Sequence, residues 1–291
     1  MKKNTFHGIL YGASGSLWWG TLGVLYFKSA SFAGPIELVI HRTIWTAFSL
    51  IVTTSLFSKW DAFFSIIRKK KELIYLLITG ILIFCNWSTW IYAVVSNKLI
   101  DASFGYFIMP ILSVFLGIIF LKESYNKQKL ISVLLVAISI IYLLINFASV
   151  PWAGLIVGFT WSAYSFLRKK INVASDIGLL IESLFLLPIA IIFFYLIVQS
   201  GQNDFTISNP FLMSLIVLAG PMTVIPLFLY VKGVEFSGLG PTGMIFFITP
   251  TCQFLLGFFY YQEPFSTDKL FSFILIWFAV FIYLKDIYEN N

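Results

Sequence analysis

Charged residues are scarce in this chain. Only 11% of its 291 residues are Asp, Glu, Lys or Arg, whereas a soluble domain usually carries about 25%. Hydrophobic residues make up 59%, and the mean hydropathy is +0.91. A chain this apolar cannot cover its surface with polar groups in water. The sequence therefore predicts an all-α polytopic protein embedded in a lipid bilayer.

Groups that carry covalent or metal chemistry are equally sparse. The two cysteines, Cys85 and Cys252, each lie in an apolar run without metal-ligand spacing, and we interpret both as small buried hydrophobes. The sequence contains no H-E-x-x-H, P-loop, G-x-S-x-G or Asp-rich diphosphate motif. We therefore expect no enzyme, no metal and no cofactor, and any transport should be driven by a gradient instead of ATP.

Long apolar stretches are abundant, and ten of them are long enough to span a bilayer as helices. The first follows Met1-Lys2-Lys3 without a convincing cleavage site, so we interpret it as a membrane helix and not as a removed signal. No connection is long enough to form a soluble domain. The predicted spans are 6–27, 36–57, 73–95, 103–121, 130–147, 152–168, 177–198, 212–232, 241–261 and 269–288.

Basic residues are distributed unevenly between the two sides that these ten spans define. With a cytoplasmic N-terminus, 15 of the 19 Lys and Arg residues fall on the cytoplasmic side. Only Lys28, Lys98 and Lys269 fall outside, and Arg42 lies within a span. This asymmetry predicts that both termini are cytoplasmic. It also explains the net charge of +6 without a nucleic-acid partner, because the basic residues form short clusters between apolar segments.

The sequence matches itself when it is shifted by 140 residues. Matched positions include Gly80 with Gly220, Pro110 with Pro250, and Glu123 with Glu263. The match divides the chain into residues 1–150 and 151–291, with five spans in each half. An odd number of spans reverses the second half relative to the first, which predicts an inverted-topology repeat of the kind that suits alternating access. The alternative is an old duplication that is retained for packing alone.

Two ionisable residues inside predicted spans occupy matching positions of the two halves. Arg42 lies in the second span, and Glu182 lies 140 residues later in the seventh. A charge near the bilayer centre costs about 2.5–3.5 kcal/mol, so such residues usually mark a cavity or an ion pair. If both face a central cavity, they pair with each other or hold the two ends of a zwitterionic substrate. The alternatives are a permanent structural ion pair and snorkelling to the interface.

The second span also carries His41, which shares one helical face with Glu37 and Trp45. Arg42 lies about 100° around the helix from His41. A histidine titrates near physiological pH, so His41 is a candidate for proton coupling. The alternative is a hydrogen-bonded packing residue.

Aromatic residues and one amide lie in the middle of the second, third and fourth spans. They are Trp45, Asn86, Trp87, Trp90 and Tyr106. Apolar walls with a few polar groups are typical of small-molecule sites, so we expect these residues to line a cavity, with plain packing as the alternative.

The other aromatic residues that stand out are assigned to the aromatic belt at the membrane interface, which is the usual place of Trp and Tyr in membrane helices. They are Trp18 and Trp19 in the first span and Trp161 and Tyr164 in the sixth.

Glycine and proline predict contacts and bends in the helices. Gly8, Gly12, Ser16 and Gly20 repeat at intervals of four residues and predict a close helix contact. Pro110 and Pro250 predict paired kinks, which act either as gates or as static bends.

Several motifs together resemble the RarD family, in the EamA branch of the drug/metabolite transporter superfamily. They are His41-Arg42-Thr43-Ile44-Trp45, Asn86-Trp87, the segment 102–110, Arg168-Lys169-Lys170 and the segment 178–182. The spacing agrees over essentially the whole chain. The resemblance implies ten helices in two EamA repeats, a bacterial inner membrane and transport. It does not fix the substrate.

These observations together predict a secondary transporter that exports a small amphiphilic metabolite or drug, such as an amino acid or a chloramphenicol-like compound, by alternating access. Its partners would be that substrate and the lipid bilayer. The alternatives are a membrane-embedded lipid-modifying enzyme and a membrane sensor that has lost transport. The sequence indicates neither the coupling ion nor the oligomeric state.

Overall fold

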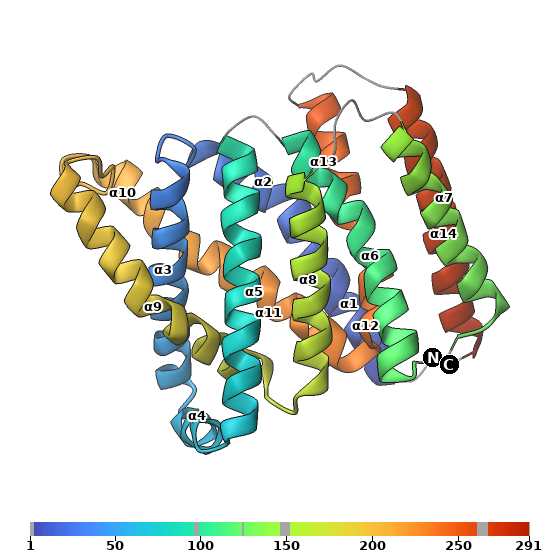
Figure 1. Ribbon diagram of the computed structural model, residues 1–291, viewed down its shortest axis with the longest axis horizontal. Coiled ribbons are helices and arrows are strands. Elements are labelled where there is room, and N and C mark those ends of the chain that lie inside the picture. Colours follow the sequence, from blue (N-terminus) through green and yellow to red (C-terminus); the bar gives the residue numbers. More distant parts are fainter. Residues whose placement is uncertain (1–2, 96–98, 124, 146–151, 261–266, 291) are drawn as a thin grey trace.

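The computed structural model describes residues 3–95, 99–123, 125–145, 152–260 and 267–290. Within these residues the regular structure is entirely helical, and the long helices lie side by side in a bundle (Figure 1). The two termini lie at the same end of the bundle (Figure 1). In chain order the elements are α1 (Lys3–Trp18), the π-helical turn η1 (Trp19–Gly23), α2 (Val24–Ser29), α3 (Pro35–Leu56), α4 (Trp60–Ile67), α5 (Lys70–Val95), α6 (Leu99–Leu121), α7 (Lys127–Ile145), α8 (Trp152–Lys170), α9 (Ser175–Ser200), α10 (Pro210–Val217), α11 (Ala219–Ser237), α12 (Leu239–Ile245), α13 (Ile248–Phe259) and α14 (Thr267–Asn290).

Helical structure covers each of the ten stretches that the sequence predicts as spans, as far as these residues are described. Three of the stretches are interrupted: the first by η1, the eighth at Leu218, and the ninth at Phe246 and Phe247. Among the described helices, four segments are long and apolar enough by themselves to cross a membrane. They are Pro35–Leu56, Lys70–Ala93, Ser175–Ser200 and Pro210–Ser237.

Local signals in the sequence set the ends of several helices. Helix α3 begins with Pro35, where the missing N–H of proline costs nothing. Helix α9 ends at Gly201, whose φ of 68° is left-handed and therefore suits glycine. Helix α10 begins after Asn209, whose side-chain oxygen accepts a hydrogen bond from the backbone N–H of Leu212 at 3.2 Å.

The short helix α4 was not predicted, because its eight residues cannot span a bilayer. It lies across one end of the bundle, next to the ends of α3 and α5 (Figure 1). Phe63 and Ile66 are buried in the core, whereas Phe64 and Ile67 are exposed. This division of apolar side chains is typical of a helix that lies along the membrane interface.

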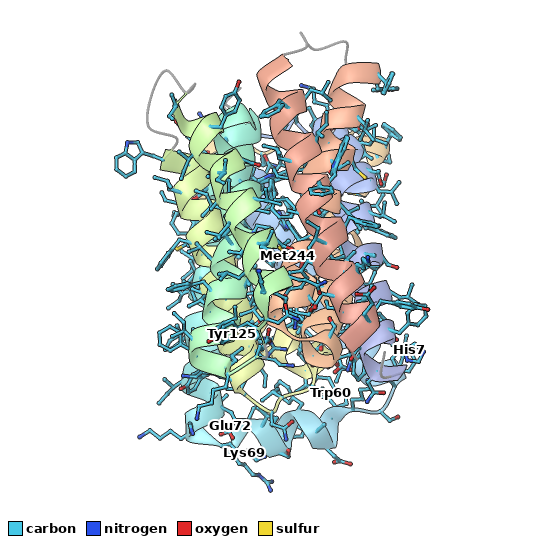
Figure 2. The ribbon with its side chains drawn as sticks, turned by 90° about the vertical axis from the view of Figure 1, so that its right-hand side faces the viewer. His7, Trp60, Lys69, Glu72, Tyr125 and Met244 are labelled. Atoms are coloured by element: carbon cyan, nitrogen blue, oxygen red, sulfur yellow. The ribbon has the colours of Figure 1, made fainter. Side chains whose placement is uncertain are left out.

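The exterior of the bundle is covered with exposed apolar side chains along the lengths of its helices. Figure 2 shows the labelled Trp60, Lys69 and Glu72 at the end of the molecule that carries α4, whereas Met244 lies near mid-height. Cys85 belongs to the exposed surface of α5, so the expectation that it is buried was wrong, and Cys252 is half-buried. A surface of this kind requires lipid around it, and the chain is a multi-pass membrane protein.

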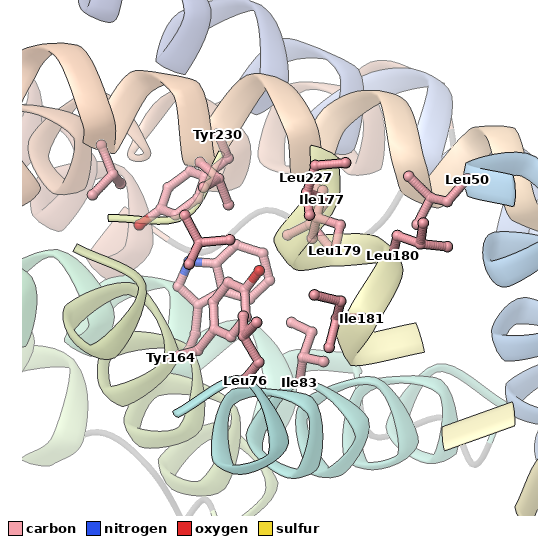
Figure 3. Close-up of a cluster of buried hydrophobic side chains, with 14 of the residues drawn as sticks. Leu50, Leu76, Ile83, Tyr164, Ile177, Leu179, Leu180, Ile181, Leu227 and Tyr230 are labelled. Carbon is pink, nitrogen blue, oxygen red and sulfur yellow. The ribbon is translucent and has the colours of Figure 1, made fainter. Parts of the chain in front are cut away.

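The central helices pack in recurring pairs. Helix α1 packs against α11 and α12, α8 packs against α5 and α6, and α3 packs against α9 and α11. The pair α7 and α14 forms one edge of the bundle, at the opposite side from α3 and α9 (Figure 1). Figure 3 shows the core cluster in which α5, α8, α9 and α11 meet, with Tyr164 and Tyr230 among its largest side chains. Both are fully buried.

Small residues allow the closest of these contacts, as the sequence predicted for the first span. A Cβ on Gly8 would lie 2.7 Å from the Cβ of Ser237, and one on Gly20 would lie 2.7 Å from the Cβ of Cys252. Ordinary side chains do not fit at such separations. The four-residue repeat of small residues therefore serves the packing of α1 and η1 against α11 and α13.

Candidate functional site

A cavity lies in the middle of the bundle between helices of both halves of the chain. Its free volume in this conformation is about 30 Å³, well below the volume of usual small-molecule sites, about 300–1,000 Å³, so side chains nearly fill it. Its wall is almost entirely aromatic and aliphatic. The lining residues are Trp19, Gly23, Phe27, Arg42, Asn86, Trp87, Trp90, Gly105, Tyr106, Met109, Val157, Trp161 and Phe246.

Two breaks in helical hydrogen bonding occur at the cavity. The π-helical turn η1 places Trp19 at the wall, where its ring meets that of Trp161 edge-on with the centroids 4.9 Å apart. The second break separates α12 from α13 and places Phe246 at the wall. Interruptions of this kind are common where a helix borders a functional site.

Proline explains the second break. Pro250 has no N–H, so it cannot donate to the carbonyl of Phe246 one turn earlier. The backbone N–H of Thr249 bonds that carbonyl instead, at 2.9 Å. In the other half, Pro110 lies within α6 directly after Met109, which lines the cavity, yet α6 continues through it. The two prolines predicted as gates therefore lie close to the cavity, with a helix break beside only one of them.

Arg42 is the charged residue of the cavity wall. Its guanidinium carbon lies 4.5 Å from the ring centroid of Trp87 and 5.0 Å from that of Phe27. The residue is only 4% exposed, and its buried Nε has no hydrogen-bond partner. Among the described lining residues no Asp or Glu accompanies it. Aromatic faces are thus the immediate surroundings of this cation.

Five of the eight residues that the sequence proposed for substrate binding line this cavity. They are Arg42, Asn86, Trp87, Trp90 and Tyr106. The amide nitrogen of Asn86 donates to the carbonyl of Val157 at 2.9 Å and to the hydroxyl of Thr160 at 3.1 Å. Asn86 therefore also joins α5 to α8 at the wall.

His41 and Trp45 lie elsewhere, on a different face of α3. The imidazole of His41 contacts the rings of Phe194 and Phe205, with centroids 4.9 Å and 4.7 Å away. Trp45 packs beside Phe48 and Phe205. One residue along a helix turns the side chain by about 100°. Since Arg42 points at the cavity, its neighbour His41 faces α9 and the α9–α10 connection instead.

Glu37 fixes that connection to the start of α3. Its carboxylate accepts hydrogen bonds from the backbone N–H groups of Asp204 and Phe205, at 2.9 Å and 3.0 Å. It also lies 3.6 Å from Nε2 of His41. Partial burial and the charge of Glu37 raise the pKa of the Asp204 carboxyl above its usual range. Glu37 therefore bonds the α9–α10 connection and is not among the residues that line the cavity.

Glu182 does not meet Arg42 among the described contacts. Its carboxylate lies 3.6 Å from Nε of Arg168, accepts a hydrogen bond from the hydroxyl of Thr79 at 2.7 Å, and accepts a longer one from Tyr164 at 3.3 Å. Each of the two repeat mates is the eighth residue of its helix, Arg42 in α3 and Glu182 in α9. Because these helices run in opposite directions (Figure 1), the two charges lie toward opposite ends of the bundle.

Several lining residues escaped the sequence analysis. Trp19 and Trp161 were assigned to the interfacial belt together with Tyr164, but the first two line the cavity and Tyr164 is fully buried. The available signal was depth, since Trp161 is the tenth residue of a 19-residue helix. For Phe27 and Phe246 the sequence offered no signal, because one phenylalanine among 32 does not stand out.

A second, more polar cavity lies away from the first, beside the start of α12. It measures about 300 Å³ and is bordered by Glu123, Lys129, Lys169 and Tyr283. Glu123 accepts hydrogen bonds from the backbone N–H groups of Leu239 and Gly240, at 2.6 Å and 2.9 Å. A carboxylate in this position stabilises a helix N-terminus. Its repeat mate Glu263 lies outside the described residues.

The fold and the cavity together define a class of protein. A multi-pass helical bundle with a lipid-facing exterior and an aromatic-lined internal cavity is an architecture typical of membrane transport proteins.

Comparisons with known proteins agree with that class. Residues 6–145 match the EamA-like transporter family. The chain is 32% identical to the protein RarD of Escherichia coli over 98% of this chain and 96% of that protein. It is 33% identical to an uncharacterized transporter of Vibrio cholerae over 98% of this chain and 94% of that one. A protein of known crystal structure shares the fold with a TM-score of 0.70, at 16% identity over 96% of this chain and 97% of that chain.

The chain belongs to the RarD family of EamA-like transporters. This confirms the resemblance that the sequence motifs indicated.

Proposed function

We propose that the chain is a secondary transporter that moves a small amphiphilic metabolite or drug across the bacterial inner membrane, as an exporter, by alternating access. The observation that carries this proposal is the position of the cavity. Its wall is built by α3, α5 and α6 from the first half of the chain and by α8 and the α12–α13 break from the second. A site between two halves becomes accessible from either side when the halves move relative to each other.

The arrangement of the helices supports an inverted repeat of five spans. Under the 140-residue shift, α1 with η1 and α2 corresponds to α8, α3 to α9, α5 to α10 with α11, α6 to α12 with α13, and α7 to α14. The two members of each pair run in opposite directions through the bundle (Figure 1). The packing follows the same exchange: α1 on α11 becomes α8 on α5, and α3 on α11 becomes α9 on α5. The pairs α3–α9, α6–α12 and α7–α14 map onto themselves.

The distribution of charge supports the orientation. Arg168, Lys169 and Lys170 form the last turn of α8, and Lys70 and Lys71 begin α5. These helix ends lie at the end of the bundle that carries α4 and the chain termini (Figure 1). Clusters of Lys and Arg remain on the cytoplasmic side of a membrane. We therefore place both termini in the cytoplasm.

The side chains of the cavity imply that a substrate enters only when helices move. Trp87, Met109 and Phe246 are 3%, 1% and 1% exposed, so solvent hardly reaches them in this conformation. The π turn at Trp19 and the break before Pro250 already lack part of the helical hydrogen-bond ladder. Bending at these positions sacrifices fewer backbone hydrogen bonds than bending elsewhere, which makes them the natural hinges.

The hydrogen-bond and ion-pair network around Glu182 would close the path from the cavity to the α4 end of the bundle. It joins α9 to Thr79 of α5 and to Tyr164 and Arg168 of α8, all in buried positions. Helix α5 belongs to the first half and α8 and α9 to the second. Opening a path from the cavity toward the α4 end separates these helices and therefore breaks this network.

The experiment is a flux measurement in proteoliposomes without ATP. Vesicles with and without protein are loaded with labelled aromatic amino acids, aromatic carboxylates and chloramphenicol, and efflux down the gradient is followed. We expect protein-dependent efflux of at least one class. Trp161→Ala should abolish it because Trp161 lines the cavity, whereas Trp152→Ala should not, since Trp152 of the same helix is 66% exposed.

Two outcomes would contradict transport. Specific binding without flux would indicate a sensor, and turnover of a labelled lipid by the pure protein would indicate an enzyme. A cysteine at Met109 adds a test that needs no substrate. Alternating access requires an impermeant thiol reagent to reach Met109→Cys from both faces of the membrane, and reaction from one face only argues against it.

A further inference from the structure

The cavity contains a positive charge without a matching negative one. Arg42 is 4% exposed and touches the faces of Phe27 and Trp87, and the described lining residues include no Asp or Glu. Taking a guanidinium out of water is costly unless an anion accompanies it. Glu182, which the sequence suggested as the partner of Arg42, and Glu37 of the same helix both bond other groups.

The positions of those acids show why neither serves as the counter-ion. Glu37 is on the same helix as Arg42 but accepts backbone hydrogen bonds from Asp204 and Phe205. Glu182 is paired with Arg168 toward the other end of the bundle. Among the described residues no Asp or Glu balances Arg42, which leaves a bound ligand to supply that charge.

Hydrogen-bond donors also outnumber their acceptors at this wall. Nε of Arg42 and Nε1 of Trp87 are buried and have no hydrogen-bond partner in the chain. Both groups donate and cannot accept. The amide hydrogens of Asn86 are already used on α8. A ligand that satisfies the free donors must present oxygen lone pairs, and a carboxylate presents them together with the missing charge.

The remainder of the wall selects the body of the ligand. Trp19, Trp90, Tyr106, Trp161 and Phe246 surround the space with ring faces and edges, and Trp161 and Phe246 lie 5.8 Å apart between centroids. Aromatic walls favour a flat apolar group. An ammonium group in this cavity would be repelled by Arg42, and no carboxylate among the described lining residues would accept its hydrogen bonds. The cavity therefore disfavours cations and gains nothing from the ammonium of a zwitterion.

We propose that this cavity binds organic monoanions, a single carboxylate on a flat apolar body, with Arg42 and the indole N–H of Trp87 holding the carboxylate. This substrate class rests on the proposed transport function for its biological meaning, and it replaces the zwitterion that a shared Arg42–Glu182 site implied.

The test uses four compounds with one phenylpropyl skeleton. They are 3-phenylpropionate, the neutral 3-phenylpropionamide, the cation 3-phenylpropylamine and the zwitterion phenylalanine. Binding to the full-length protein in detergent is measured by thermal shift and by calorimetry at one pH. A charge-assisted hydrogen bond contributes about 1.5–3 kcal/mol, so we expect the carboxylate to bind about 10- to 100-fold more tightly than the amide. The amine should not bind.

Variants separate recognition from folding. Arg42→Gln should remove the preference for the carboxylate over the amide, and Arg42→Lys should keep the preference at lower affinity because it keeps the charge. Trp87→Phe removes one N–H donor, retains an aromatic ring and should weaken carboxylate binding. Lys28→Gln is the matched control, since Lys28 is an exposed basic residue of α2 and should leave binding unchanged.

The outcomes distinguish this inference from the transport function. Equal or tighter binding of the amine, the amide or phenylalanine overturns the anion class, whatever the flux measurement shows. Tight carboxylate binding that depends on Arg42, combined with no efflux, supports the anion class and overturns transport. Carboxylate binding that survives Arg42→Gln unchanged overturns the role of Arg42.

Discussion

At the scale of single residues, the matching charges of the two halves, Arg42 and Glu182, lie in different surroundings. Arg42 lies among aromatic faces, and the described residues of its cavity include no acid, whereas Glu182 is paired with Arg168 and bonded to Thr79. A buried ion pair with one member removed leaves a charge that neither water nor a partner stabilises. Because a buried unpaired charge is costly, we infer that Arg42 takes its counter-ion from a ligand. For the same reason, the paired Glu182 holds helices together.

Glu182→Gln tests the structural role of that pair. The substitution keeps the shape and one acceptor oxygen of the side chain but removes its charge, which leaves Arg168, 4% exposed, buried without a counter-ion. We expect the free energy of unfolding to fall by about 3–5 kcal/mol. Reversible unfolding of the purified protein, followed by circular dichroism, measures it.

The control is Asp176→Asn on the same helix. Asp176 pairs with Lys59, whose side chain is 47% exposed, and an exposed ion pair contributes at most about 1 kcal/mol. The substitution should therefore change stability little. Equal losses from Glu182→Gln and Asp176→Asn would show that the buried pair has no special role, and Arg168→Gln added to Glu182→Gln should recover part of the loss.

At the scale of helices, close contacts depend on glycine more in one half than in the other. Gly80 and Gly220 occupy matching positions, and each packs against the span that carries the other half's buried charge. Gly80 of α5 lies against α9, where a Cβ on Gly80 would be 3.4 Å from the carbonyl oxygen of Glu182. A Cβ on Gly220 would overlap the backbone carbonyl of Trp45 on α3. Helix α11 therefore approaches α3 more closely than α5 approaches α9 at this point.

Gly220→Ala should destabilise the protein, and Gly80→Ala should not. Forcing a methyl group into a filled contact costs about 1–3 kcal/mol or more. In Gly80→Ala the methyl group fits, and the higher helix propensity of alanine contributes up to about 1 kcal/mol in favour of the fold. Thermal unfolding of both variants under identical conditions measures the difference. Similar melting temperatures for the two would contradict the asymmetric packing.

At the scale of the whole molecule, basic residues and helix directions agree on one orientation. The last turn of α8 is basic and lies at the end with the termini, whereas the α9–α10 connection lies at the other end (Figure 1). An even number of membrane crossings places both termini on one side. The ten-span inverted repeat that we propose would satisfy this requirement.

Cysteine labelling checks the orientation. In a variant with Cys85 and Cys252 replaced by alanine, Lys170→Cys and Gln202→Cys each place one thiol at an exposed position of opposite ends of the bundle. We expect an impermeant maleimide added to intact cells to label Gln202→Cys and to reach Lys170→Cys only after permeabilisation. The reverse pattern would invert the orientation, and labelling of both in intact cells would contradict the ten-span topology.

The sequence by itself determined the membrane environment, the helical segments and the family. Apolar runs of about 20 residues have few alternatives to spanning helices, because an unpaired backbone group in lipid is too costly. It also singled out five cavity residues, among them Arg42 and Trp87, since polar and aromatic groups in the middle of a span are rare enough to be noticed.

Only the tertiary structure decided which residues meet. The rotation of α3 about its axis directs Arg42 to the cavity and His41 away from it. The packing of the helices places Glu182 beside Arg168 instead of beside Arg42. Trp19 reached the wall through the π turn and Phe246 through the break between α12 and α13, and no local pattern encodes either irregularity. Periodicity fixes which residues share a helix face, but the rotation of each helix and the partner it packs against follow from the fit of all the helices together.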